Sequence, residues 1–200
     1  MTVPPTLDPA LQQLGLACAA CCRCALAEGR HQVVVSRGNP RARLMLIGEA
    51  PGAQEDALGL PFVGRSGQLL DQLLAQAGLD SNRDLYLCNV VKCRPPQNRK
   101  PSPMEMQACR GWLEQQIALV DPPLILLAGA SALQGVLGIR GGISRLRGAW
   151  QPWQERWLMP IFHPSYLLRY PSVQPGSPRA LTLADLQAAR QRLAPMPETL

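Results

Sequence analysis

The chain has 200 residues, of which 46% are hydrophobic and 17% are charged, and its formal net charge is +6 at pH 7. This balance excludes a chain that is disordered along its whole length, and it predicts a globular domain with a buried core. No apolar run approaches the roughly 18 residues of a membrane helix, and the start of the chain lacks the positive charge of a secretory signal, so we expect a cytoplasmic protein with no membrane partner. The basic excess favours an anionic partner such as nucleic acid.

Apolar periodicity and turn residues predict helices that alternate with strands. In chain order the expected elements are a short helix at Pro9–Leu16, an extended stretch at Val33–Val35, a strand at Arg43–Gly48, a helix at Ser66–Leu79, a strand at Asp84–Val91, a helix from Pro103 to Val120, a strand at Leu124–Ala128, a short helix at Ser131–Leu137, a loop or hairpin at Gly141–Gly148, a strand at Trp157–Ile161 and a helix at Arg179–Leu193. Pro160 argues for an edge position or an irregular ladder in the last of these strands.

This alternation is typical of a parallel sheet covered by helices on both faces. We expect a single α/β domain with three α/β/α layers around a central, four-stranded, mainly parallel sheet. The domain is expected to span 18–194, with an N-terminal arm at 1–17 and a tail at 195–200.

Four of the seven cysteines have the spacing of a metal site. Cys21 and Cys24 form a close C-x-x-C pair, and Cys93 and Cys109 can complete four thiolates if the loop and helix that carry them fold back together. Spacing alone admits zinc or an iron-sulfur cluster, and it admits Cys18 with Cys21 as a competing first pair. In a cytoplasmic chain, such cysteines are thiols or metal ligands rather than disulfides.

The most unusual residues follow the strands, where ligands bind in sheets of this kind. Four segments occur in order: Gly48-Glu-Ala-Pro-Gly52, Pro61-Phe-Val-Gly-Arg-Ser-Gly67, Asn89-Val-Val-Lys-Cys-Arg-Pro-Pro96 and His163-Pro-Ser-Tyr-Leu-Leu-Arg169. Together with the cysteine spacing, they resemble the family 4 uracil-DNA glycosylases, the iron-sulfur branch of the uracil-DNA glycosylase superfamily. The resemblance spans about Cys21 to Arg169.

The resemblance implies a [4Fe-4S] cluster, with zinc as the less favoured metal, on Cys21, Cys24, Cys93 and Cys109. Uracil offers a donor at N3 and an acceptor at O4, which one side-chain amide can pair with simultaneously, and Asn89 is the expected reader. Phe62 resembles the family's base-stacking aromatic residue, with core packing as the alternative. Backbone groups from Ala50 to Gly52 are expected to help to hold the base.

Cleavage of a glycosidic bond needs a donor near uracil O2 and negative charge near the sugar. His163 fits the donor role. Related families carry an aspartate where this chain has Ala50, and family 4 shares that gap. Glu49 and Glu55 are therefore the carboxylates expected to position water or stabilise charge, with turn capping or an ion pair to Arg65 as the alternative.

The same rim is expected to contact DNA. Lys92, Arg94 and Arg99 offer partners for phosphate groups, and Ser165 to Arg169 resembles a wedge. In that wedge, Leu167 or Leu168 would fill the gap left by a flipped nucleotide, and Arg169 would contact a phosphate or the minor groove. Packing at the start of a helix is the alternative for the leucines.

These observations predict a monofunctional uracil-DNA glycosylase, a monomer that acts on uracil-containing single- or double-stranded DNA and leaves an abasic site. One alternative is a noncatalytic, metal-cluster nucleic-acid-binding module on the same fold. A second is a branch of the superfamily that forms a covalent adduct with DNA, but that branch would need a histidine between Gln97 and Pro103, where this chain has none.

Overall fold

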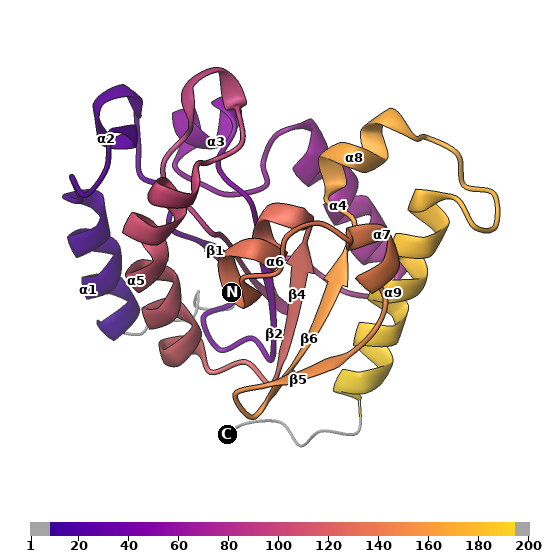
Figure 1. Ribbon diagram of the computed structural model, residues 1–200. Coiled ribbons are helices and arrows are strands. Elements are labelled where there is room, and N and C mark those ends of the chain that lie inside the picture. The colour runs from indigo at the N-terminus through magenta and orange to yellow at the C-terminus, as the bar shows by residue number, and fades with distance from the viewer. Residues whose placement is uncertain (1–8, 195–200) are drawn as a thin grey trace, which may run out of the picture.

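A six-stranded mixed sheet forms the centre of the computed structural model, which describes residues 9–194 (Figure 1). The strands are β1 (Arg37–Gly38), β2 (Leu44–Gly48), β3 (Leu85–Asn89), β4 (Leu124–Ala128), β5 (Gln151–Trp153) and β6 (Arg156–Ile161). Their order across the sheet is β1-β3-β2-β4-β6-β5. The four inner strands are mutually parallel, and the short outer strands β1 and β5 are antiparallel to their neighbours.

Helices cover both faces of this sheet (Figure 1). They are α1 (Pro9–Ala19), α2 (Leu26–Gly29), α3 (Ala53–Leu58), α4 (Arg65–Gln76), α5 (Pro103–Val120), α6 (Ala130–Leu137), α7 (Ile143–Leu146), α8 (Pro164–Arg169) and α9 (Pro178–Leu193), with a 3-10 turn η1 at Pro96–Asn98. None of these helices, within residues 9–194, is both long enough and apolar enough to cross a membrane.

The inner strands are buried on both faces, and their side chains alternate between two cores. Met45 and Ile47 of β2 belong to the core under α1, α5 and α6, whereas Leu44 and Leu46 belong to the core under α4 and α9. The other inner strands divide in the same way. The fold is therefore the expected three-layer α/β/α sandwich.

The sheet has two more strands than the four predicted. Two- and three-residue edge strands such as β1 and β5 carry too little alternation to be recognised in a sequence. The expected loop at Gly141–Gly148 contains the single turn α7, and no helix was predicted at Ala53–Leu58, where α3 forms.

Pro160 lies in β6, which is not an edge strand. However, β5 pairs only with the Arg156–Leu158 part of β6, so the sheet has no partner on that side at Pro160. A missing N–H is tolerated at such a position. The edge position expected from this proline is therefore not found, and its pairing with β4 keeps a regular register, Leu127 with Pro160 and Ala128 with Ile161.

Helix α1 extends through the predicted boundary between arm and domain and packs on α5. Leu11, Leu14 and Cys18 of α1 are buried in the core. Residues 1–8 of the predicted arm and the predicted tail at 195–200 lie outside the described residues.

The parallel strands bring four loops to one edge of the sheet. The chain leaves β2 toward the face covered by α4, but it leaves β3 and β4 toward the face covered by α5 and α6. Loops that diverge in this way open a crevice at the carboxyl ends of the strands, where doubly wound sheets bind their ligands.

Candidate functional site

Gly48, the last residue of β2, lies between two of the predicted uracil-binding side chains. It is paired in register with Asn89 of β3. A Cβ atom at this position would collide with the Phe62 ring and would lie 2.5 Å from Asn89 Oδ1. Only glycine allows the ring and the amide to approach the backbone so closely. The structure therefore brings together Phe62 and Asn89, which are far apart in the sequence.

The backbone at Phe62 is fixed in an uncommon conformation. Its φ of 57° lies in the left-handed region, which is costly for an aromatic residue. Arg37 stabilises the turn because its guanidinium donates to Phe62 O at 3.2 Å and to Pro61 O at 2.8 Å, and it also pairs with Asp71 at 2.7 Å. The buried ring of Phe62 is thereby held toward the sheet edge.

Asn89 is only 2% exposed. Its backbone carbonyl accepts a hydrogen bond from Lys92 Nζ at 2.5 Å. Its side-chain amide has no hydrogen-bond partner among residues 9–194, so both its donor and its acceptor are available to a ligand.

His163 follows β6 and caps α8. The Ser165 backbone N–H donates to His163 Nδ1 at 3.2 Å, and Ser165 Oγ lies 2.8 Å from the same nitrogen. A backbone N–H can only donate, so Nδ1 is an acceptor, and the ring proton of the neutral imidazole is assigned to Nε2. Burial lowers the pKa of His163, against the opposing effect of Glu49 and Glu55. The neutral ring is therefore the form expected near pH 7, with Nε2–H as a donor.

Glu49 and Ser131 join the loops that follow β2 and β4. The Ser131 hydroxyl donates a short hydrogen bond to Glu49 Oε2. Ser131 is the second residue of α6, so the carboxylate also lies near the positive end of that helix. Both residues line a cleft of about 250 Å³, together with His163, Ser165 and Arg169. Phe62 and Asn89 are not among the lining residues of this cleft, but the Phe62 ring centroid lies 6.3 Å from that of His163.

Glu55 has the capping role that was the alternative in the sequence. Its buried carboxylate accepts hydrogen bonds from the backbone N–H groups of Gly52, Val63 and Gly64, at 3.1, 3.0 and 2.8 Å. Because these three donors occupy the carboxylate, the expected role in positioning water does not fit this structure. Glu55 instead joins the Gly52 turn to the segment that carries Phe62.

Lys92 and Leu167 do not fit the DNA contacts predicted for them. The Lys92 side chain is fully buried, so it presents no surface to a phosphate group. Leu167 is also fully buried, in the core next to α4, which leaves the half-buried Leu168 as the candidate wedge. Amphipathic patterning over six residues could not distinguish the inward leucine from the outward one.

Of the other predicted DNA contacts, Ser165 and Arg169 line the cleft, whereas Arg94 and Arg99 lie in the segment between β3 and α5. Arg94 donates to Asn98 Oδ1 at 2.7 Å, and Arg99 forms a two-point ion pair with Glu105 at 2.6 and 2.9 Å. The hydrogen bonds from Arg99 are the main reason that the pKa of Glu105 is lowered to about 2. Arg99 therefore fixes the loop before α5, while it remains 47% exposed. Ser165 and Arg169 are exposed on α8.

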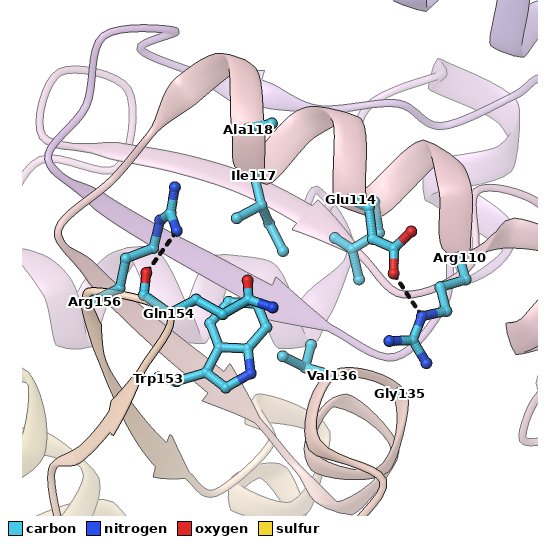
Figure 2. A pocket seen from close by; sticks show the side chains of 10 residues that line it. Arg110, Glu114, Ile117, Ala118, Gly135, Val136, Trp153, Gln154 and Arg156 are labelled. Atoms are coloured by element: carbon cyan, nitrogen blue, oxygen red, sulfur yellow. Dashed lines mark hydrogen bonds and ion pairs between the residues drawn. The ribbon is translucent and has the colours of Figure 1, made fainter.

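A second cavity lies away from this site. It measures about 350 Å³ and lies between α5, α6 and the β5–β6 turn. Figure 2 shows the side chains that line it. Leu113, Ile117, Val136 and Trp153 provide apolar lining, and the Arg110–Glu114 pair lies at its edge. None of the site residues predicted from the sequence lines it.

The four predicted metal ligands come together on the other side of β3. Cys21, Cys24, Cys93 and Cys109 line one narrow cavity, together with Cys18. Three of the sulfur atoms accept N–H groups: Cys21 from Trp112 Nε1 at 3.3 Å, Cys93 from Arg30 Nη1 at 3.5 Å and Cys109 from the Lys92 backbone at 3.2 Å. None of the seven cysteines forms a disulfide. Within residues 9–194, no three Cys, His, Asp or Glu side chains are arranged to hold a single metal ion.

Sequence reasoning missed three residues that support the site: Arg37, Ser131 and, as a partner of His163, Ser165. The signal for Ser131 was available, because it follows a predicted strand at the same edge as Glu49. Arg37 had no signal, since it acts on a loop 25 residues further along the chain.

Comparison with known proteins agrees with this geometry. Residues 35–187 match the family model of the uracil DNA glycosylase superfamily. The chain is 43% identical over 172 residues to the type-4 uracil-DNA glycosylase of Thermotoga maritima, covering 85% of this chain and 88% of that protein. It is 37% identical to the corresponding protein of Archaeoglobus fulgidus, covering 78% and 81%, and 34% identical to that of Saccharolobus solfataricus, covering 90% and 85%. The chain therefore belongs to the type-4 family of the uracil-DNA glycosylase superfamily.

Proposed function

We propose that this chain is a monofunctional uracil-DNA glycosylase, which turns uracil out of DNA and hydrolyses its N-glycosidic bond to leave an abasic site. The observation that carries the proposal is the approach of Phe62 and Asn89 to Gly48, with His163 beside the Phe62 ring. An aromatic face, a free amide and an imidazole donor are the groups that a flipped uracil needs.

Asn89 would select uracil. Its Nδ2–H donates to uracil O4 and its Oδ1 accepts from N3–H. Cytosine has an amino group in place of O4 and an unprotonated N3, so both contacts would become repulsive or unpaired. A buried site that is committed to hydrogen-bond one partner discriminates strongly against an analogue that cannot make the bonds. The 2% exposure of Asn89 supports such a site.

His163 would stabilise the leaving group. As the C1′–N1 bond breaks, its electron pair leaves with uracil, and negative charge develops on O2. Because Nδ1 accepts from Ser165, the ring proton is on Nε2, which faces away from Ser165. The lowered pKa of His163 keeps the ring neutral. The neutral imidazole can stabilise the uracil anion by a hydrogen bond from Nε2–H to O2, with no transfer of the proton.

Glu49 would stabilise the sugar cation and orient the attacking water. Ser131 holds one carboxylate oxygen and leaves the other free to accept a hydrogen bond from water. The oxygen of water bonds to C1′ and keeps one proton, and the other proton passes through Glu49 or solvent to the uracil anion, which leaves as neutral uracil. Lys92 is buried against Asn89 O, which argues against a lysine adduct at that position and favours the simple hydrolytic reaction.

The DNA surface is proposed to be the rim around this cleft. Leu168 would fill the gap left by the flipped nucleotide, while Ser165, Arg169 and Arg94 would contact phosphate or the minor groove. Arg99 would contribute mainly by holding its loop in place. The chain would act as a monomer, on single- or double-stranded DNA.

Cys21, Cys24, Cys93 and Cys109 are proposed to hold a [4Fe-4S] cluster. Their convergence on one cavity supports this, as do the N–H groups that three of the sulfur atoms accept, because such hydrogen bonds stabilise thiolate ligands. When bound, the cluster would supply a cross-link between the N-terminal segment, the loop after β3 and helix α5. No step of the reaction needs it.

The test uses protein purified with and without oxygen, incubated with single- and double-stranded oligonucleotides that carry one uracil. We expect free uracil and alkali-sensitive strand breaks at the uracil position. Binding to DNA without release of uracil from either substrate would refute the enzyme and favour the noncatalytic module. For the cofactor, we expect absorbance near 400 nm with matching iron and sulfide, and stoichiometric zinc without iron would refute the cluster.

A further inference from the structure

Lys92 is the largest fully buried side chain among the described residues. Lysine is rarely buried completely unless it is paired, because an ammonium group loses much hydration in the protein interior. No Asp or Glu in residues 9–194 forms an ion pair with it. The mechanism proposed above does not use this cation, so its position needs another explanation.

The contacts of Lys92 connect three segments of the chain. Its Nζ donates to Asn89 O at 2.5 Å, and its backbone N–H donates to Cys109 Sγ at 3.2 Å. Its backbone carbonyl accepts from Val34 N at 2.8 Å. The residue thus lies between the base-reading end of β3, the cysteine of α5 and the segment that follows the C-x-x-C pair.

The polar groups closest to Lys92 on this side of β3 are sulfur atoms, because Lys92 lines the same narrow cavity as the four proposed ligands. Four thiolates around an iron-sulfur cluster carry a net negative charge that a buried ammonium would offset. Lys92 is itself adjacent to Cys93, a proposed ligand.

We propose that Lys92 is a positioning residue that links the cysteine cluster to base recognition. Its positive charge offsets the negative charge of the thiolate ligands, and its hydrogen bonds fix Asn89 relative to Cys109. This inference rests on the proposed function. It adds that the cluster supports uracil selectivity through a single residue, whose backbone N–H reaches Cys109 and whose side chain reaches Asn89, and it moves Lys92 from the DNA surface to the interior.

The test compares the full-length variants Lys92→Met and Lys92→Arg with the wild type. Met removes the charge and the donor while keeping an unbranched side chain, whereas Arg keeps both. Arg41→Met is the matched control, because it removes an exposed positive charge before β2, at the opposite edge of the sheet. The readouts are iron and sulfide content, the midpoint potential of the cluster, and the affinity for DNA that carries a noncleavable 2′-fluoro-deoxyuridine relative to the same DNA with thymidine.

We expect Lys92→Met to shift the midpoint potential to more negative values, because loss of a nearby cation destabilises the more negative, reduced cluster. We also expect it to lower the preference for uracil about tenfold or more. This is the size of effect typical for a residue that supports a binding group without touching the ligand. Lys92→Arg should shift the potential less, and Arg41→Met should match the wild type. Loss of the cluster in Lys92→Met but not in Lys92→Arg would equally support the role of the charge.

An unchanged potential or an unchanged uracil preference in Lys92→Met would overturn the inference. Loss of the cluster in both Lys92 variants would also overturn it, since side-chain size rather than charge would then be decisive. Wild-type protein assayed in parallel distinguishes failure of the proposed function from failure of the role of Lys92. If the wild type releases no uracil, the proposed function fails, whereas if it releases uracil and Lys92→Met behaves like it, only the role of Lys92 fails. A wild type without an iron-sulfur cluster would overturn both the cofactor proposal and this inference.

Discussion

Replacement of Asn89 by alanine should remove most of the activity on uracil while leaving the fold in place. The side-chain amide has no hydrogen-bond partner among residues 9–194, so the native protein loses no internal hydrogen bond. The bound uracil, by contrast, would keep O4 and N3–H buried without partners in a site that is almost closed to water. Each unpaired group costs about 1–3 kcal/mol, or about 2–6 kcal/mol together. At about 1.4 kcal/mol per factor of ten, kcat/KM should fall by roughly 30-fold to 10⁴-fold.

The assay is single-turnover release of uracil from a duplex oligonucleotide, with thermal unfolding measured on the same samples. Asn39→Ala is a suitable control, because this half-buried asparagine follows β1 and lies beside the start of β3, at the end of the sheet opposite the site. Its amide donates to Arg83 O at 2.8 Å. The control should keep wild-type activity. Less than a threefold loss in Asn89→Ala would refute its role as the base reader, whereas a loss that accompanies a large fall in melting temperature would point to a structural effect.

Three further predictions concern the residues around the site. Glu105→Gln should lower stability by about 1–3 kcal/mol at pH 7 but have little effect at pH 2 and below. Arg99 is the main cause that lowers the pKa of Glu105 to about 2, so the ionised carboxylate stabilises the fold fully above pH 4.5 and progressively less as the pH falls through 2. Urea unfolding at pH 7 and at pH 2 measures this, and equal losses at both would contradict it. Ser131→Ala should lower kcat about 5- to 30-fold with little change in KM, because Glu49 loses the donor that orients it, and Ser131→Thr should restore activity; a change confined to KM would be inconsistent with that role. Leu168→Ala should slow release of uracil from double-stranded DNA more than from single-stranded DNA, since only a duplex leaves a gap in its stack, and equal effects on the two substrates would exclude the wedge.

The inner architecture could be predicted because burial on both faces leaves a clear pattern. Leu44–Ile47 and Leu124–Ala128 are continuous apolar runs with turn residues after them, and Ser102 with Glu105 forms the capping box that the sequence indicated at the start of α5. Because the carboxyl ends of parallel strands meet at one edge of a sheet, Asn89 and His163 could be placed at the same edge without any knowledge of their contacts.

The errors occurred where the environment of a side chain decides its role. Lys92 and Glu55 have the sequence context of surface residues. In the structure, Lys92 is buried and donates to Asn89 O, and the Glu55 carboxylate accepts hydrogen bonds from three backbone N–H groups. Leu167 and Leu168 are adjacent and identical, and only the packing of α8 on α4 distinguishes them. Short antiparallel edge strands such as β5 depend on a neighbouring strand rather than on their own pattern.

Hydrolysis is tested by the mass of the products formed in water enriched in ¹⁸O. Attack at C1′ places the solvent oxygen on the sugar, so we expect unlabelled free uracil and an abasic strand that carries one ¹⁸O atom. An intact uracil-containing strand, or a strand covalently attached to the protein, would contradict it.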